Sequence, residues 1–121
     1  MKKILLSIKP KYVNKIFSGE KKVEYRKNVV PDVELVYIYA TVPIKKIVAE
    51  FKVNKVLCGT PNELWIETKD IGGIDFKDYC EYFARRDKAY AYIISNLQIY
   101  DTPLLLSDLG IKRPPQNYQY I

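Results

Sequence analysis

The fold is decided by residues 35–57, which have the sequence LVYIYATVPIKKIVAEFKVNKVL. Residues 35–41 and 46–57 are rich in β-branched and aromatic side chains and alternate with a period of two, a pattern typical of strands. The connection between them contains Pro43 and is too short for the crossover that two parallel strands need. The sequence therefore predicts an antiparallel strand pair, which argues against a doubly wound parallel sheet.

Further strand patterns precede and follow this pair. Residues 3–8 form a short apolar run, and residues 22–26 and 88–100 have strand patterns of their own. In residues 22–26, Val23 and Tyr25 share one face, so we expect a half-buried strand. We expect all the strands to share one core that contains Val23, Tyr25, Val36, Ile38, Ile47, Ala49, Phe51, Ala91 and Ile93, with Phe17 and Phe83 packing helices against it.

Three short helices are expected between the strands. The first begins near Pro10, which suits a first helical turn, and ends at Ser18-Gly19. Thr60 and Glu63 form a capping box that opens the second helix, and the apolar spacing in residues 76–86 indicates the third. Strands and helices in this order predict an α+β domain built on a curled sheet or barrel.

Length and composition exclude several classes of protein. A chain of 121 residues has room for one core, so we expect residues 1–121 to form a single domain. No apolar run approaches the roughly 20 residues that span a bilayer, so we expect a cytoplasmic chain with no membrane partner. The absence of histidine removes the Ser/His/Asp and Cys/His catalytic arrangements. Cys58 and Cys80 match no disulfide framework or metal motif, so we expect core thiols, no metal and no cofactor.

The positive charge is concentrated at the N-terminus. The formal net charge is +6, yet residues 1–28 alone carry nine Lys or Arg against two Glu, while residues 29–121 carry eleven basic and twelve acidic residues. Such an asymmetry is typical of a surface that binds a polyanion. The alternative is a lysine-rich surface that only contacts solvent.

Residues 19–26, GEKKVEYR, combine opposite charges at a chain turn. The glycine allows a left-handed exit from the preceding helix, so Lys21 follows on a turn while Glu24 and Arg26 lie on one strand face. A carboxylate between two cations suits the polar edge of a base beside its phosphate. The alternative is that Glu24 forms a surface ion pair with Lys22 or Arg26.

This G-x-K-x-x-E-x-R signature resembles the ASCH domain family, which is part of the PUA-like superfamily. The resemblance extends to the opening ILLSIKPKYVNKIFSGEKKVEYRK, the central VYIYATVP followed by IVAEFKV, and the closing DLGIKRPPQNYQYI, all similar to stand-alone ASCH proteins. It implies a PUA-like small β-barrel of about five to six mostly antiparallel strands with short helices packed around it. The resemblance also implies that the signature lies at the mouth of a cleft between the barrel and the first helix.

The resemblance gives a set of expected binding residues. Besides Lys21, Glu24 and Arg26 it includes Ser7 and Lys9, which end the first strand and should lie beside the cleft. Arg113 is a further phosphate candidate because the adjacent prolines present it rigidly. Weaker candidates are Arg85, Arg86 and Lys112 for phosphate, and Tyr37, Tyr39, Tyr90, Tyr92, Tyr118 and Tyr120 for base stacking, most of which we expect in the core.

Two classes of function follow from the resemblance. The first is a binding module for RNA or a nucleotide-like ligand, in RNA metabolism or in the regulation of translation or transcription. The alternative is a small hydrolase of RNA or a modified nucleoside, with Lys21 and Glu24 as general acid and base. A family amidohydrolase that deacylates N4-acetylcytidine uses a threonine three residues after the motif lysine. Glu24 occupies that position here, so we do not expect that activity. The ligand and the oligomeric state stay open.

Overall fold

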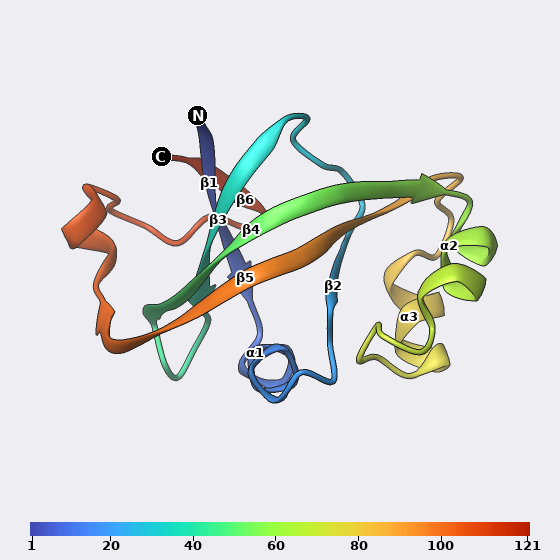
Figure 1. Cartoon of the computed structure of the whole chain (residues 1–121), viewed down its shortest axis with the longest axis horizontal. Helices are drawn as coiled ribbons and strands as arrows, with labels where there is room; N and C mark the ends of the chain where they lie inside the picture. The colour runs from blue at the N-terminus through green and yellow to red at the C-terminus, as the bar shows by residue number, and fades with distance from the viewer.

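A computed structural model describes residues 1–121 and contains ten elements in chain order (Figure 1). They are β1 (Lys2–Ile8), α1 (Pro10–Ser18), β2 (Val23–Arg26), β3 (Val33–Ala40), β4 (Lys46–Gly59), α2 (Pro61–Thr68), α3 (Phe76–Tyr82), β5 (Ala89–Leu104), the 3-10 helix η1 (Leu106–Leu109) and β6 (Tyr118–Tyr120). The longest helix, α1, has nine residues, so none of the helices has the length of a membrane span.

All six strands belong to one sheet with the order β2-β5-β4-β3-β1-β6. The predicted central pair is confirmed, because β3 and β4 run antiparallel with Val36 opposite Phe51 and Ile38 opposite Ala49. The β4–β5, β2–β5 and β1–β6 pairs are also antiparallel. Only β1 and β3 are parallel, because α1 and β2 lie between them in sequence and provide the crossover.

The sheet curls until β2, at one edge, approaches β1 near the other. A guanidinium nitrogen of Arg26 in β2 donates to the backbone carbonyl of Ser7 in β1 over 2.9 Å, although three strands separate β1 and β2 in the sheet order. The long strands β4 and β5 pair with several register shifts, and such irregularities bend a sheet. The result is the expected α+β, barrel-like fold, in which α1 lies beside the seam between β1 and β2 (Figure 1).

The apolar side chains form three clusters, so the expected single core is wrong. The largest cluster contains Val36, Ile38, Ala49 and Phe51 together with the buried face of α1. Neighbouring residues of one strand belong to different clusters, as Ala91 and Tyr92 show. Successive side chains of a strand point to opposite faces, and both faces of this sheet are covered. The second cluster holds Val23, Tyr25, Phe83 and Ala91, the third holds Ile47, and Phe17 and Ile93 are partly buried.

The ends of α1 and the start of α2 follow the local signals, whereas α3 ends at Tyr82, earlier than the expected end near residue 86. Pro10 is at the start of α1, and Gly19 ends it with a left-handed φ of 84°. The capping box of α2 between Thr60 and Glu63 is present in both directions. The two cysteines are exposed and free, so their expected burial is wrong. In α3 the buried positions belong to Tyr79 and to the following Phe83, which leaves the thiol between them on the solvent side.

Candidate functional site

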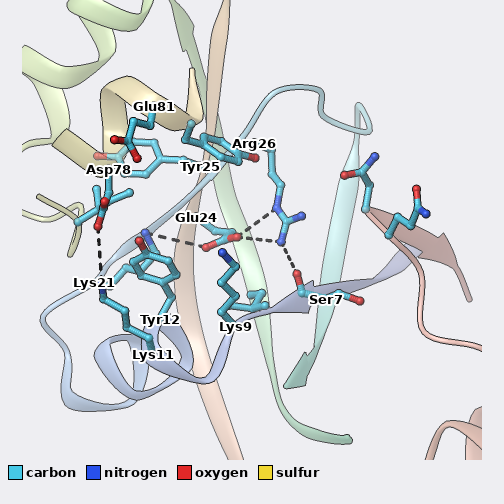
Figure 2. A pocket seen from close by; sticks show the side chains of 15 residues that line it. Ser7, Lys9, Lys11, Tyr12, Lys21, Glu24, Tyr25, Arg26, Asp78 and Glu81 are labelled. Atoms are coloured by element: carbon cyan, nitrogen blue, oxygen red, sulfur yellow. Dashed lines mark hydrogen bonds and ion pairs between the residues drawn. The ribbon is translucent and has the colours of Figure 1, made fainter. Parts of the chain in front are cut away.

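A cleft of about 660 Å³ opens at the seam of the sheet, between β1, α1, β2 and α3. Figure 2 shows the side chains that surround it. Neither the cleft nor the rest of the structure contains a group of three or more His, Cys, Asp or Glu residues that could hold a metal ion. The cleft is lined by Ser7, Ile8, Lys9, Lys11, Tyr12, Lys21, Glu24, Tyr25, Arg26, Ile74, Asp78, Glu81, Tyr82, Gln116 and Asn117.

Three charged side chains, Lys21, Glu24 and Arg26, form the floor of the cleft. One carboxylate oxygen of Glu24 accepts from Arg26 Nε at 3.1 Å and lies 2.9 Å from Arg26 Nη2. The other oxygen lies 4.0 Å from Lys21 Nζ. These side chains are only 3%, 8% and 11% exposed for Lys21, Glu24 and Arg26, respectively. The expected carboxylate between two cations is therefore present, and it is buried rather than a surface ion pair.

The ammonium group of Lys21 is enclosed by polar and aromatic partners. Its Nζ donates to the carbonyl of Gly72 over 2.7 Å and lies 5.3 Å from the ring centroid of Tyr12 and 4.7 Å from that of Tyr25. Burial lowers the pKa of Lys21 from its ordinary value, and the neighbouring Glu24 carboxylate only partly offsets this effect. A lysine of this kind exchanges protons closer to neutral pH than a surface lysine does.

Local structure explains why Lys21 points inward. After Gly19 the backbone N–H of Lys21 donates to the carbonyl of Lys15, and the N–H of Lys22 donates to the carbonyl of Ile71. The segment is thereby held between α1 and the loop before α3. The strand β2 is buried on both faces, because Val23 and Tyr25 pack against the apolar cluster of α2 and α3 while Glu24 is enclosed by charged partners, so the expected half-buried strand is corrected.

The rim of the cleft consists of Lys9, Lys11, Asp78 and Glu81. Lys11 and Asp78 form an ion pair of 3.5 Å between α1 and α3, with side chains 59% and 36% exposed (Figure 2). Lys9 is exposed at the N-terminal end of α1, and Glu81 is exposed on α3. The rim therefore carries basic groups on its α1 side and acidic groups on its α3 side.

The structure brings five of the six expected binding residues together. Ser7 and Lys9 line the same cleft as the three floor residues. Ser7 also donates its hydroxyl to the carbonyl of Pro115 over 2.6 Å, which fixes the C-terminal segment against β1. Arg113 is exposed and is not among the lining residues, so the structure does not bring it together with the other five. The anchored segment presents Gln116 and Asn117 to the cleft instead, one and two residues after the anchor.

Sequence reasoning missed the aromatic and acidic parts of the lining. None of the six tyrosines considered for stacking lines the cleft, whereas Tyr12, Tyr25 and Tyr82 do. Asp78 and Glu81 are three residues apart on α3, and this spacing was the available signal for a common helix face. Arg86 donates to the carbonyl of Lys27 and the side chain of Asn28. Like the other secondary phosphate candidates, Arg85 and Lys112, it lies outside the lining.

A curled sheet of this topology with a charged seam defines an ASCH-type domain. The chain belongs to the ASCH domain family, which matches residues 6–98. It is similar to the ASCH domain-containing ribonuclease of Zymomonas mobilis, with 28% identity over 126 residues that cover 99% of this chain and 84% of the relative. The crystal structure of ASCH from Zymomonas mobilis has a TM-score of 0.89 and 26% identity, covering 98% of this chain and 87% of that one.

Longer proteins also contain a similar segment. The chain is 29% identical over 120 residues to the large ribosomal subunit protein uL22 of Ureaplasma parvum. This match covers 98% of the chain and 39% of that relative. The chain therefore spans well under half the length of this curated relative.

Proposed function

We propose that the cleft binds single-stranded RNA, with a phosphate at its floor and a base against its aromatic side. The observation that carries the proposal is the buried Lys21, Glu24 and Arg26 network facing an open cleft. Two cations around one carboxylate leave the floor with an excess positive charge, and such a floor attracts phosphate. A cleft of about 660 Å³ is in the size range of small-ligand sites.

Arg26 is the principal phosphate ligand in this proposal. Its Nε and Nη2 are engaged by Glu24 and by the Ser7 carbonyl, which orients the guanidinium plane and leaves Nη1 free for a ligand. Lys9 adds an exposed ammonium at the same end of the cleft. Tyr12 and Tyr82 line the cleft with rings on which an unpaired base stacks.

A second candidate function is cleavage of the bound RNA, favoured by the similarity to a Zymomonas mobilis protein named a ribonuclease. A substrate oxygen fits within hydrogen-bonding distance of both Lys21 Nζ and Glu24, because 4.0 Å is less than twice the usual distance of about 2.8 Å. In this proposal the neutral amine of Lys21 takes the proton of a ribose 2′-hydroxyl, and the 2′-oxygen attacks phosphorus. The P–O5′ bond breaks, and the 5′-oxygen takes a proton from water.

Glu24 and Arg26 support these steps without exchanging a proton themselves. The carboxylate of Glu24 stabilises the ammonium that Lys21 becomes, and Arg26 neutralises charge that develops on the phosphoryl oxygens. The products are a 2′,3′-cyclic phosphate and a free 5′-hydroxyl. Because burial lowers the pKa of Lys21, cleavage should increase with pH as this amine loses its proton.

Binding is tested by titrating a fluorescent single-stranded RNA at several salt concentrations, starting near 50 mM. Arg26→Ala and Lys9→Ala should each weaken binding and flatten the log–log salt dependence by about 0.7, the loss of one single-strand phosphate contact. Lys22→Ala is the matched control, because Lys22 is exposed and is not part of the lining. Equal binding by the parent, Arg26→Ala and Lys9→Ala proteins would contradict the proposal.

Cleavage is tested by incubating the protein with end-labelled RNA and identifying the new ends. The expected products are a 2′,3′-cyclic phosphate and a 5′-hydroxyl, lost in Lys21→Met. RNA with 2′-fluoro sugars lacks the nucleophile and should bind without being cut. Binding without any cleavage of ordinary RNA would leave a binding module and exclude the second function.

A further inference from the structure

The rim of the cleft consists of two walls that carry opposite charges. One wall carries Lys9 and Lys11 at the start of α1, and the other carries Asp78 and Glu81 on α3. A spacing of three residues places the two carboxylates on the same face of α3. A ligand that fills the cleft therefore meets cations on one side and hydrogen-bond acceptors on the other.

Among these carboxylates, Glu81 is the one that is available to a ligand. It takes part in none of the four ion pairs of the chain. Asp78 lies 3.5 Å from Lys11, and Glu24 on the floor is already bound by Arg26 and faces Lys21. The cleft carboxylate without an ion-pair partner is thus on α3, next in sequence to Tyr82, which also lines the cleft.

The charge of RNA fixes how it would lie between the two walls. A phosphate is repelled by Asp78 and Glu81 and attracted by Lys9 and Arg26, so the base attached to it is directed toward α3. There the base lies beside Tyr82, whose ring already has Lys27 Nζ 5.0 Å from its centroid, and presents its polar edge to Glu81.

We infer that the α3 wall makes the cleft select bases with an exocyclic amino group, namely cytosine, adenine and guanine, over uracil. This inference rests on the proposed RNA binding. An amino group donates to a carboxylate, as it does when Glu or Asp contacts the amino group of cytosine. Uracil has no amino group, and the carbonyl oxygen that stands at the position of the cytosine amino group is repelled by Glu81, so only its ring N3–H can donate to the carboxylate. Glu81 thereby determines which bases are preferred. Asp78 is a second hydrogen-bond acceptor, and its charge is partly neutralised by Lys11.

The test compares four pentanucleotides with 2′-fluoro sugars, which cannot be cleaved through the 2′-position. One is all uridine, and each of the others has a single cytidine, adenosine or guanosine at the centre. The parent protein should bind the three amino-containing oligonucleotides about fivefold or more tightly than the uridine one. In Glu81→Gln this preference should shrink toward equal binding, because the new amide also donates to uracil carbonyls.

Glu67→Gln on α2 is the control, since it removes the same charge from an exposed position outside the cleft and should leave the preference unchanged. Equal binding of the four oligonucleotides by the parent would overturn the inference while leaving the proposed function intact. A preference that survives unchanged in Glu81→Gln would also overturn it, whatever the result for Asp78→Asn. Failure of all four oligonucleotides to bind would overturn the proposed function itself, and the inference with it.

Discussion

The floor and the rim of the cleft contain the same kinds of side chain in two different environments. On the floor, Lys21, Glu24 and Arg26 are almost completely buried, and each has defined partners. On the rim, Lys11 and Asp78 form a pair of 3.5 Å with both side chains open to solvent. Water screens the rim pair, whereas the floor charges depend on one another. Burial therefore decides which charges hold the structure together and which are left accessible to solvent.

The largest effect is expected from removing the floor carboxylate. Glu24→Gln leaves Lys21 and Arg26 buried without their counter-charge, so the free energy of unfolding should fall by about 3–5 kcal/mol. Urea titration measures this loss. The exposed Glu67→Gln variant should change stability by less than about 0.5 kcal/mol. A comparably small loss for Glu24→Gln would show that the buried floor charges do not depend on one another for stability.

A smaller effect is expected from the loop that holds Lys21 in place. A Cβ at Gly73 would lie 2.5 Å from the Cβ and 3.1 Å from the Cα of Lys21, and Gly73 has a left-handed φ of 61°. Gly110 has a similar φ of 72° with nothing within 4 Å. Gly73→Ala should therefore lose about 1–3 kcal/mol more unfolding free energy than Gly110→Ala in the same urea experiment. Equal losses of unfolding free energy in the two variants would show that only the left-handed backbone conformation is strained. The contact between residue 73 and Lys21 would then contribute nothing.

The pH dependence of stability should also distinguish a buried floor charge from an exposed one. The pKa of Lys21 is lowered in the folded chain, mainly by burial, so between that value and 10.5 the unfolded chain binds more protons than the folded one. The parent should therefore gain stability relative to Lys21→Met as pH rises through this window, as measured by urea midpoints. Below the window both states are charged, and the difference should be constant. Lys22→Met, at an exposed position, should show no such trend.

The smallest effect is expected at the rim. Because both partners are exposed, the coupling energy between Lys11 and Asp78 should be about 0–1 kcal/mol and should decrease with added salt. A double-mutant cycle of Lys11→Ala and Asp78→Ala in low and high salt measures it. A salt-independent coupling energy above about 2 kcal/mol would show that the rim charges interact as strongly as the buried floor charges.

Local features of the sequence determined most of the secondary structure and part of the site. The alternation in residues 35–57 predicted the β3–β4 pair, and the signals at Gly19 and Thr60 predicted where α1 ends and α2 begins. The signature in residues 19–26 predicted the three charges that meet on the floor. These predictions succeeded because strand alternation, helix caps and short charge spacings depend on neighbours only a few residues away.

The tertiary structure alone decided the rest. The parallel β1–β3 pairing, the separation of the apolar residues onto two sheet faces and the burial of Lys21 under Gly72 all join segments far apart in sequence. The same holds for the acidic wall on α3 and for the anchoring of Pro115 on Ser7, which brings Gln116 and Asn117 to the cleft in place of Arg113. No short-range pattern encodes such contacts, because they arise only when the curled sheet brings β1, β2 and α3 to one seam.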